Sequence, residues 1–275
     1  MKNSQKRIAL INDITGFGRC SVTVMLPVIS ALKVQVCPLP TAILSVHTGF
    51  GEHYIDDYTA RMRPYMENWQ ANNLVFDGIC TGFFGAAEQV DIAIDFIKNF
   101  RRQNTCVLID PVMGDHGRLY SSITKEICRE IKKLLTYADV ATPNLTEACE
   151  LLGVPYPANG KMTERELAAM AKKLAAFGLR QVIVTGMDDG KFLLNYIYDN
   201  GDAEIFRTKK IGGDRSGTGD VFTAIVAACL VKGEKLADSA VKAARFIEKT
   251  ITFAEELNLP WNYGLPIEEY LTELK

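Results

Sequence analysis

Short apolar segments alternate with amphipathic segments along the chain up to about residue 187. Six of the short segments are rich in β-branched residues and predict strands at 7–11, 34–40, 77–83, 106–112, 139–144 and 181–187. Apolar residues also recur with helical spacing, which predicts helices at 85–102, 121–136 and 163–177. This alternation predicts an α/β fold with a mostly parallel central sheet and helices on both faces.

The pattern changes after residue 187. Residues 191–211 alternate between apolar and polar positions around an Asp-Asn-Gly-Asp turn, which predicts a β-hairpin. Two apolar helices follow, at about 218–233 and 235–257, and the tail contains Pro260 and Pro266. No linker, repeat or low-complexity tract interrupts the pattern, so we expect one domain over residues 1–275.

Composition narrows the class of protein. The chain has 275 residues, 48% of them hydrophobic, and a formal net charge of -2, so it can bury a core and offers no basic surface for nucleic acid. Its 7 cysteines are scattered without a C-x-x-C pair, as in a reduced cytoplasmic protein. No apolar run is long enough for a membrane span, and the first one stops at Asn12-Asp13, too early for a signal peptide.

Polar, acidic or glycine-rich residues follow most of the predicted strands. In open α/β sheets, ligands bind outside the carboxyl ends of the strands. We therefore expect these stretches to converge on one site; they are residues 12–16, 40–41, 81–83, 110–111, 142–144, 185–186 and 212–220.

The stretch GGDRSGTGD, at 212–220, precedes one of the apolar helices. Its glycines let backbone N–H groups point at an anion, and the helix dipole adds to the attraction. Asp220, in the first turn, could act as a general base on a substrate hydroxyl. The same residues are also typical of an ordinary helix start, and this motif alone leaves both interpretations open.

Two further motifs carry acidic residues. Asp110 in LIDPVMGDHGRLY follows a strand, where it could hold a metal or phosphate-bound water, or simply open an Asp-Pro turn. In TPNLTE, Asn144 and Glu147 fit a capping box. Glu147 could also reach magnesium through water, because magnesium prefers carboxylates and retained waters. The two roles of Glu147 are compatible.

The sequence does not support several common types of cofactor-binding or catalytic site. INDITGFGRCSV contains Gly16-x-Gly18, but Ser21 takes the third position of the dinucleotide fingerprint and no acidic residue ends the next strand. A nicotinamide site is therefore not expected, and Asp13 instead suits a ligand contact. Walker A, G-x-S-x-G and H-E-x-x-H motifs are absent from the sequence. His47 is more simply a structural histidine.

Together these stretches resemble the ribokinase-like superfamily and, within it, the pyridoxal kinases, over nearly the whole chain and in matching order. GTGD at 217–220 is similar to the superfamily signature. DPVMGD-x-G-x-LY and TPN-x-x-E resemble its vitamin-kinase branch. PLPTAILSVHTGFG, at 38–51, is similar to the segment with which pyridoxal kinases hold the pyridine ring.

The resemblance implies a role for each matching residue. Asp220 would be the base that activates the substrate hydroxymethyl group, and the amides of Gly217, Thr218 and Gly219 would receive the transferred phosphoryl group. The ligand contacts that it implies are as follows: Asp110 and Glu147 for Mg2+; Asp110, Asn144 and Thr185 for ATP; Asp13, Thr41 and His47 for the vitamin pocket, with Phe83 stacked on the ring. Lys209, Lys210 and Arg215 could each meet the ATP phosphates or be solvated loop charges, and of these Lys209 is the expected ATP contact.

The implied activity is ATP- and Mg2+-dependent phosphorylation of the 5'-hydroxymethyl group of pyridoxal, pyridoxamine or pyridoxine by a cytoplasmic homodimer. Two features depart from the family. Asn12-Asp13 stands where pyridoxal kinases often have Ser and is more like the hydroxymethylpyrimidine kinases, although those usually have Cys at the position of Asp220. Phe83 stands where the family often has Tyr. Hydroxymethylpyrimidine is therefore the alternative substrate. A non-catalytic vitamin or nucleotide sensor is less expected, because a sensor needs no base.

Overall fold

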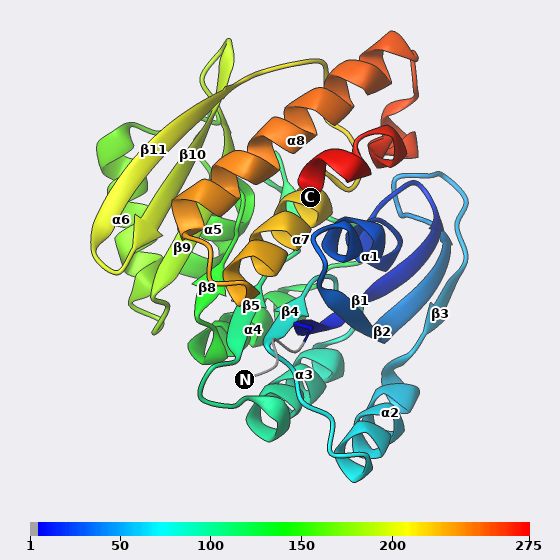
Figure 1. Cartoon of the computed structure of the whole chain (residues 1–275). Helices are drawn as coiled ribbons and strands as arrows, with labels where there is room; N and C mark the ends of the chain where they lie inside the picture. The colour runs from blue at the N-terminus through cyan, green and yellow to red at the C-terminus, as the bar shows by residue number, and fades with distance from the viewer. Residues whose placement is uncertain (1–4) are drawn as a thin grey trace.

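A nine-stranded sheet forms the centre of the computed structural model, which describes residues 5–275 (Figure 1). The strand order is β11-β10-β9-β8-β5-β4-β1-β2-β3. The strands from β9 to β2 pair in parallel, whereas β3, β10 and β11 are antiparallel to their neighbours. The bounds are β1 Arg7–Phe17, β2 Gln35–Val46, β3 Ile55–Asp57, β4 Gly78–Thr81, β5 Cys106–Ile109, β8 Val140–Ala141, β9 Gln181–Asp188, β10 Phe192–Asp199 and β11 Asp202–Lys209.

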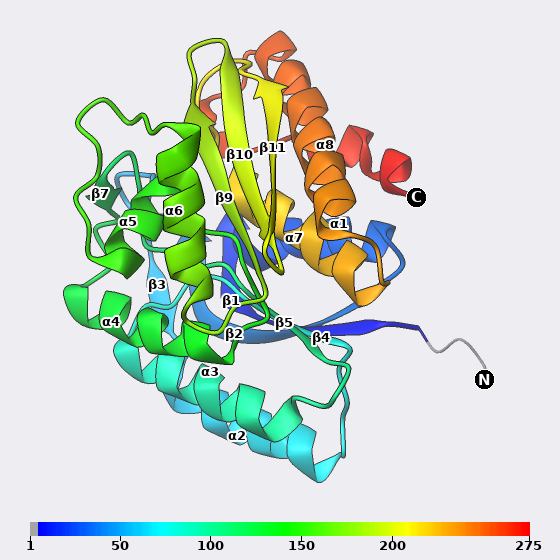
Figure 2. The ribbon, with the colours of Figure 1, turned by 90° about the vertical axis from the view of Figure 1, so that its left-hand side faces the viewer.

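Helices cover both faces of this sheet (Figure 2). One face packs against α1 Ser21–Ala31, α7 Thr218–Val231 and α8 Leu236–Glu256. The other packs against α2 Thr59–Ala71, α3 Ala87–Phe100, α4 Lys125–Leu134, α5 Leu145–Leu152 and α6 Glu164–Ala175. Each face of the sheet has its own hydrophobic core, and successive side chains of β1 point alternately to the two faces. Ile8 and Leu10 pack on the side of α1, α7 and α8, whereas Ala9 and Ile11 pack on the side of α2 to α6. The predicted α/β fold with a mostly parallel sheet is confirmed.

Short elements complete the chain. A small hairpin, β6 Gly114–Asp115 and β7 Arg118–Leu119, forms a separate sheet after β5. In the described part of the chain, 3-10 segments lie at Leu135–Tyr137, Trp261–Tyr263, Ile267–Glu269 and Leu271–Leu274. None of the helices within residues 5–275 is long and apolar enough to cross a membrane.

The first two strands are longer than their apolar patterns indicate. β1 runs to Phe17 rather than residue 11, and β2 to Val46 rather than residue 40. They continue because they pair with each other, through the register Ile14↔Ile43 to Phe17↔Val46, and because β3 pairs with the outer side of β2. Several candidate ligand residues therefore lie inside strands and not in loops after them.

Other differences are local. The helix predicted at 121–136 begins only at Lys125, because the Thr124 side chain accepts from the amide of Ile127 and caps it there. Helix α2 was not predicted, since only Met62 and Met66 of its residues are buried and its apolar stripe is narrow. The hairpin of β10 and β11 turns at Asn200-Gly201, as predicted.

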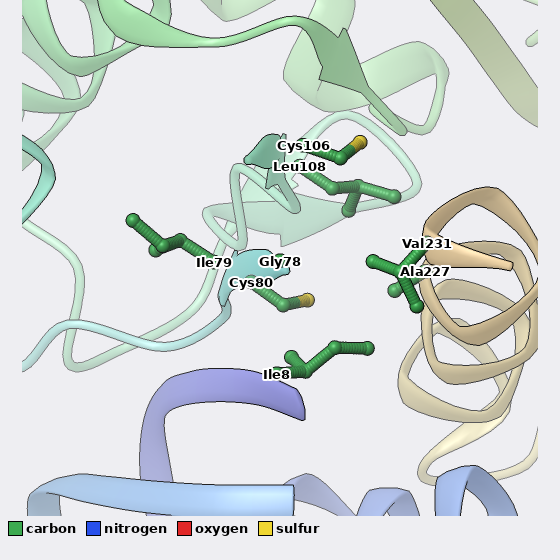
Figure 3. A pocket seen from close by; sticks show the side chains of 8 residues that line it. All are labelled: Ile8, Gly78, Ile79, Cys80, Cys106, Leu108, Ala227 and Val231. Atoms are coloured by element: carbon green, nitrogen blue, oxygen red, sulfur yellow. The ribbon is translucent and has the colours of Figure 1, made fainter. Parts of the chain in front are cut away.

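A gap in the core lies away from the carboxyl ends of the strands. Apolar and sulfur-containing residues line it: Ile8, Gly78, Ile79, Cys80, Cys106, Leu108, Ala227 and Val231 (Figure 3). Gly78 and Cys106 are the first residues of β4 and β5, so this gap lies at the amino ends of the strands. The lining offers no charged group, and we assign the gap to packing between the sheet and α7.

Candidate active site

The N-terminus of α7 is open to a ligand. Gly217 caps it with a φ of 76°, and a Cβ there would lie 2.0 Å from the carbonyl oxygen of Arg19, so only glycine fits. Among residues 5–275 no side chain caps this helix, and its first amides have no acceptor within the helix. Apart from its chain neighbours and the backbone of the helix, a Cβ on Gly219 would meet no described atom within 4 Å. An anion can therefore approach the amides of Thr218 and Gly219.

Asp220 stands in the first turn of the same helix. Its Oδ2 accepts from the amide of Ser21 at 2.9 Å, and its Oδ1 accepts from Asn12 Nδ2 at 3.3 Å. Burial raises the pKa of Asp220 to about 7, and the charge of Asp13 acts in the same direction, against the hydrogen bond from Ser21. A carboxylate with a pKa near the working pH is suited to general base catalysis.

Asp13 lies on β1 opposite a bulge in β2. The register between the two strands shifts between Asn12 and Ile14, where Asp13 faces two residues of β2, Thr41 and Ala42. The side chain is 3% exposed, and Thr15 Oγ1 donates to its Oδ2 at 2.6 Å. Burial raises the pKa of Asp13 in spite of this hydrogen bond. Asp13 is buried and Asp220 is partly buried, and the two carboxyl groups are close enough to influence each other.

Asp110 and Glu147 are a second acidic pair. Asp110 follows β5 and accepts from Thr223 Oγ1 at 2.8 Å. Burial raises the pKa of Asp110 to about 7, and the charge of Asp220 adds to the effect. Glu147 Oε1 accepts from the amide of Met113 at 3.1 Å. Burial and the charge of Asp110 raise the pKa of Glu147. A cation between these groups would relieve their repulsion.

This donor set fits Mg2+. Magnesium is usually held by one or two carboxylates together with waters and substrate phosphates. The part of the chain from residue 5 onward has no cluster of three or more His, Cys, Asp or Glu side chains arranged to hold a metal by themselves. Asp110 and Glu147 would therefore hold the ion partly through water and phosphate, as the sequence suggests.

The capping box predicted for α5 is present. Asn144 accepts from the amide of Glu147 at 3.0 Å, and Glu147 Oε2 accepts from the amide of Asn144 at 2.8 Å. Asn144 also donates to the carbonyl of Gly114 at 2.8 Å and pairs with Thr185 of β9 in a parallel bridge. The structure thus brings Asn144, Thr185 and Glu147 to the same edge as Asp110.

The three basic residues near the glycine-rich loop have different surroundings. Lys210 pairs with Asp188 at 2.7 Å, and Arg215 with Glu255 at 2.6 Å. Lys209, the last residue of β11, is exposed and makes no ion pair with any residue of the described range 5–275. Of the three, Lys209 is the one with a side chain available to a nucleotide.

Two of the residues expected around the vitamin, Thr41 and His47, already use their polar atoms in hydrogen bonds within the protein. Thr41 is fully buried, and its Oγ1 donates to the carbonyl of Phe83 at 2.9 Å. Both ring nitrogens of His47 are engaged, Nε2 with the carbonyl of Asn262 at 2.8 Å and Nδ1 with the amide of Gly49 at 3.0 Å. A ligand would therefore meet the ring of His47 by its face or edge, and the half-buried Phe83 ring remains available for stacking.

Sequence reasoning missed the part played by the C-terminal tail. Carbonyl groups of residues 259–263 accept hydrogen bonds from Arg19, His47, Arg215 and Ser216. The rings of Phe17, His47, Phe50, Trp261 and Tyr263 form an aromatic cluster with centroids 4.9 to 6.4 Å apart. No sequence signal marks these contacts, because most of them use backbone carbonyls that any residue offers.

A family model described as phosphomethylpyrimidine kinase matches residues 28–264. The chain belongs to this family. The match includes the glycine-rich loop, Asp110, Glu147 and Asp220, and it confirms the resemblance to the vitamin kinases of the ribokinase-like superfamily.

Individual relatives carry names for two kinds of substrate, a pyridine alcohol and a pyrimidine alcohol. The chain is 30% identical to a Bacillus subtilis pyridoxine kinase over 66% of both chains. It is 29% identical to a Staphylococcus aureus hydroxymethylpyrimidine/phosphomethylpyrimidine kinase over 68% of this chain and 66% of the relative. The aligned segments thus span about two thirds of each of these curated relatives.

A crystal structure with pyridoxal gives a comparison over nearly all of the residues of this chain. It is that of a Bacteroides thetaiotaomicron protein provisionally identified as a phosphomethylpyrimidine kinase. That protein is 36% identical, with a TM-score of 0.95, and the alignment covers 98% of this chain and 96% of that one. The family is thus clear, whereas the relatives do not distinguish the pyridine from the pyrimidine substrate.

Proposed function

We propose that the chain transfers the γ-phosphoryl group of ATP to the 5'-hydroxymethyl group of pyridoxal, pyridoxamine or pyridoxine. The observation that carries this proposal is the placement of Asp220 beside the uncapped N-terminus of α7, with Asp110 and Glu147 nearby. The solved relative that binds pyridoxal supports a pyridine vitamin as the acceptor.

In the proposed mechanism the chain places two substrates and moves one proton. Phosphoryl transfer requires alignment and charge neutralisation more than covalent catalysis. Asp220 accepts the proton of the hydroxymethyl group as that oxygen attacks the γ-phosphorus, the bond from this phosphorus to the β-phosphate oxygen breaks, and ADP leaves. The amides of Thr218 and Gly219, with Gly217 before them, stabilise the charge on the transferred group. Asp110 and Glu147 would hold Mg2+, which would supply further charge neutralisation.

Other residues would bind the vitamin and ATP and orient them for the transfer. Phe83 would stack on the vitamin ring, with Thr41 holding the Phe83 loop and Asp13 facing a protonated ring nitrogen. His47 would contribute the side of its ring. On the nucleotide side, Asn144, Thr185 and Lys209 would lie along ATP, with Lys209 as the cationic contact. We also propose a cytoplasmic homodimer, for which light scattering on the purified protein is the test.

Hydroxymethylpyrimidine is the second candidate substrate. The Staphylococcus aureus relative is named for it, and the acidic Asn12-Asp13 pattern resembles that branch. A carboxyl group at position 13 can face the ring nitrogen of either heterocycle, so this side chain does not separate them. Asp220, rather than Cys, favours the pyridine vitamers.

A coupled ADP-release assay tests the proposal. Purified protein receives ATP and Mg2+ with pyridoxal, pyridoxamine, pyridoxine or hydroxymethylpyrimidine in parallel. We expect higher kcat/KM on the three pyridine alcohols. Turnover on the pyrimidine alone would replace the first candidate by the second. No turnover with any of the four, together with tight vitamin binding by calorimetry, would leave a sensor.

A further inference from the structure

Asn12 is a fully buried side chain on β1 that the proposed chemistry has not used. Its amide oxygen accepts from the backbone amides of Phe83 at 2.8 Å and Asp13 at 3.0 Å. Its amide nitrogen donates to Asp220 Oδ1 at 3.3 Å and to Met25 Sδ at 3.4 Å. All the hydrogen-bonding groups of this side chain are therefore engaged, and they join β1 to the loop after β4 and to α7.

The direction of the amide follows from its partners. Two backbone N–H groups face one end of the Asn12 amide, and that end must be the oxygen because an NH2 group cannot accept from them. The NH2 end then points at Asp220. Gly82 gives the amide its space, since a Cβ at this position would lie 2.5 Å from the Asn12 amide atoms. The local sequence is thus adapted to hold Asn12 in one orientation.

We infer that Asn12 is a positioning residue, which fixes the Asp220 carboxylate relative to the Phe83 loop. The inference rests on the proposed function, in which Phe83 contacts the vitamin ring and Asp220 takes the proton of its hydroxymethyl group. The ring and the hydroxymethyl oxygen are a fixed distance apart in the substrate. One side chain that bonds to both protein groups therefore sets whether the base meets that oxygen, and a misplacement of 1 Å costs about 100-fold in rate.

Acidic groups on several elements surround Asp220. Each of the two oxygens of Asp220 has one donor: Asn12 Nδ2 on Oδ1 and the amide of Ser21 on Oδ2. The titratable groups that interact with Asp220 from the elements around it are Asp13 on β1, Cys20 before α1, Cys80 on β4, Asp110 after β5 and Tyr120 after β7. Loss of the Asn12 donor would leave Asp220 Oδ1 without its hydrogen bond while these acidic groups remain around it.

The decisive variant is Asn12→Asp. It keeps an oxygen for the amides of Phe83 and Asp13, and it replaces the donor to Asp220 by a second carboxylate oxygen. We expect kcat to fall about 10- to 100-fold with little change in the KM for the vitamin. We also expect the acid limb of the pH–kcat profile to move to higher pH, because a like charge disfavours ionisation of Asp220.

Gln181→Glu is the matched control. Gln181 Nε2 donates to Asp199 Oδ1 at 3.0 Å, so this exchange also turns an amide donor beside a carboxylate into an acid. Gln181 is the first residue of β9, at the opposite end of the strands from the site. We expect it to lower Tm modestly, without effect on kcat or on the pH profile.

The outcomes separate the two proposals. A purely structural Asn12 predicts that Asn12→Asp lowers Tm and keeps the wild-type kcat and pH profile, and this result would overturn the inference alone. Wild-type protein without turnover on any of the four alcohols would overturn the proposed function and, with it, the role of Asn12. If Asn12→Asp does not fold, Asn12→Ala takes its place. Its kcat per folded molecule, from circular dichroism, must fall while vitamin affinity by calorimetry persists, or the inference is wrong.

Discussion

Thr223 donates a hydrogen bond of 2.8 Å to Asp110, and it does so from the same helix that carries Asp220. Thr142 Oγ1 lies 3.1 Å from Thr223 Oγ1, and it must be the donor there because Thr223 gives its proton to Asp110. A relay of two hydroxyl groups thus holds one carboxylate oxygen of Asp110. The proposed metal ligand and the proposed base are therefore positioned by one rigid element.

Thr223→Val tests this relay with a side chain of similar shape. Asp110 would lose a hydrogen bond that favours its charged form, so its pKa should rise further and its affinity for Mg2+ should fall. We expect a several-fold higher Mg2+ concentration for half-maximal rate, measured by titration at saturating ATP. Stability should drop by about 1–3 kcal/mol, because Thr142 is left without its partner. An unchanged Mg2+ titration would place the ion away from Asp110.

Asp220→Asn should separate catalysis from folding. The amide is nearly isosteric but cannot accept the hydroxymethyl proton, so kcat should fall by about 10²- to 10⁴-fold. Tm should be equal to or higher than that of the wild type, since a buried charge next to Asp13 is removed. Rate and thermal unfolding are both measured on the same preparation. A variant that keeps the wild-type kcat would show that another group is the base.

The pH dependence of activity follows from the same carboxyl groups. Burial raises the pKa values of Asp220 and Asp110 to about 7. Both must be ionised, one to accept a proton and the other to hold Mg2+. We therefore expect kcat/KM without excess Mg2+ to fall as the pH drops through about 7, and saturating Mg2+ to move this limb to lower pH. A rate that is flat down to pH 5 would contradict the raised pKa values.

The free energy of unfolding should change with pH in the direction opposite to the activity. A carboxyl group whose folded pKa of about 7 exceeds its ordinary value of 3.8 binds more protons folded than unfolded between these values. The free energy of unfolding therefore decreases as the pH rises through this window. Urea titrations of the metal-free protein at pH 5, 6, 7 and 8 measure the slope, and Asp220→Asn should make it shallower. An identical slope in the variant would mean that Asp220 does not contribute.

The sequence predicts the structure correctly where the local pattern of apolar and polar residues determines it. Asp110, Glu147 and Asp220 could be predicted because each stands at the end of an apolar strand or in the first turn of a helix, where the composition changes abruptly. The sheet could be predicted for the same reason, since buried strands and amphipathic helices differ in period.

What escaped prediction depends on non-local contacts. β1 continues past residue 11 because the next strand, β2, continues beside it and β3 pairs with the outer side of β2. Two partners of Asn12, Phe83 and Asp220, lie 71 and 208 residues away, and an asparagine within a strand gives no sign of them. The contacts of the tail with Arg19, Arg215 and Ser216 use carbonyl groups, which carry no sequence signature.

Alanine substitutions at Gly217 and Gly219 test whether the transferred phosphoryl group approaches the N-terminus of α7. The same substitution should act differently at these two neighbouring positions. In Gly217→Ala the new Cβ would collide with the carbonyl of Arg19 and strain a left-handed backbone, so the variant should lose stability and activity together. In Gly219→Ala the Cβ enters free space on a helix, where alanine is favoured by up to about 1 kcal/mol, so folding should be intact. Its methyl group would nevertheless stand where the phosphoryl group approaches the α7 amides, and kcat should fall with Tm preserved. Full activity in Gly219→Ala would place the transferred group elsewhere.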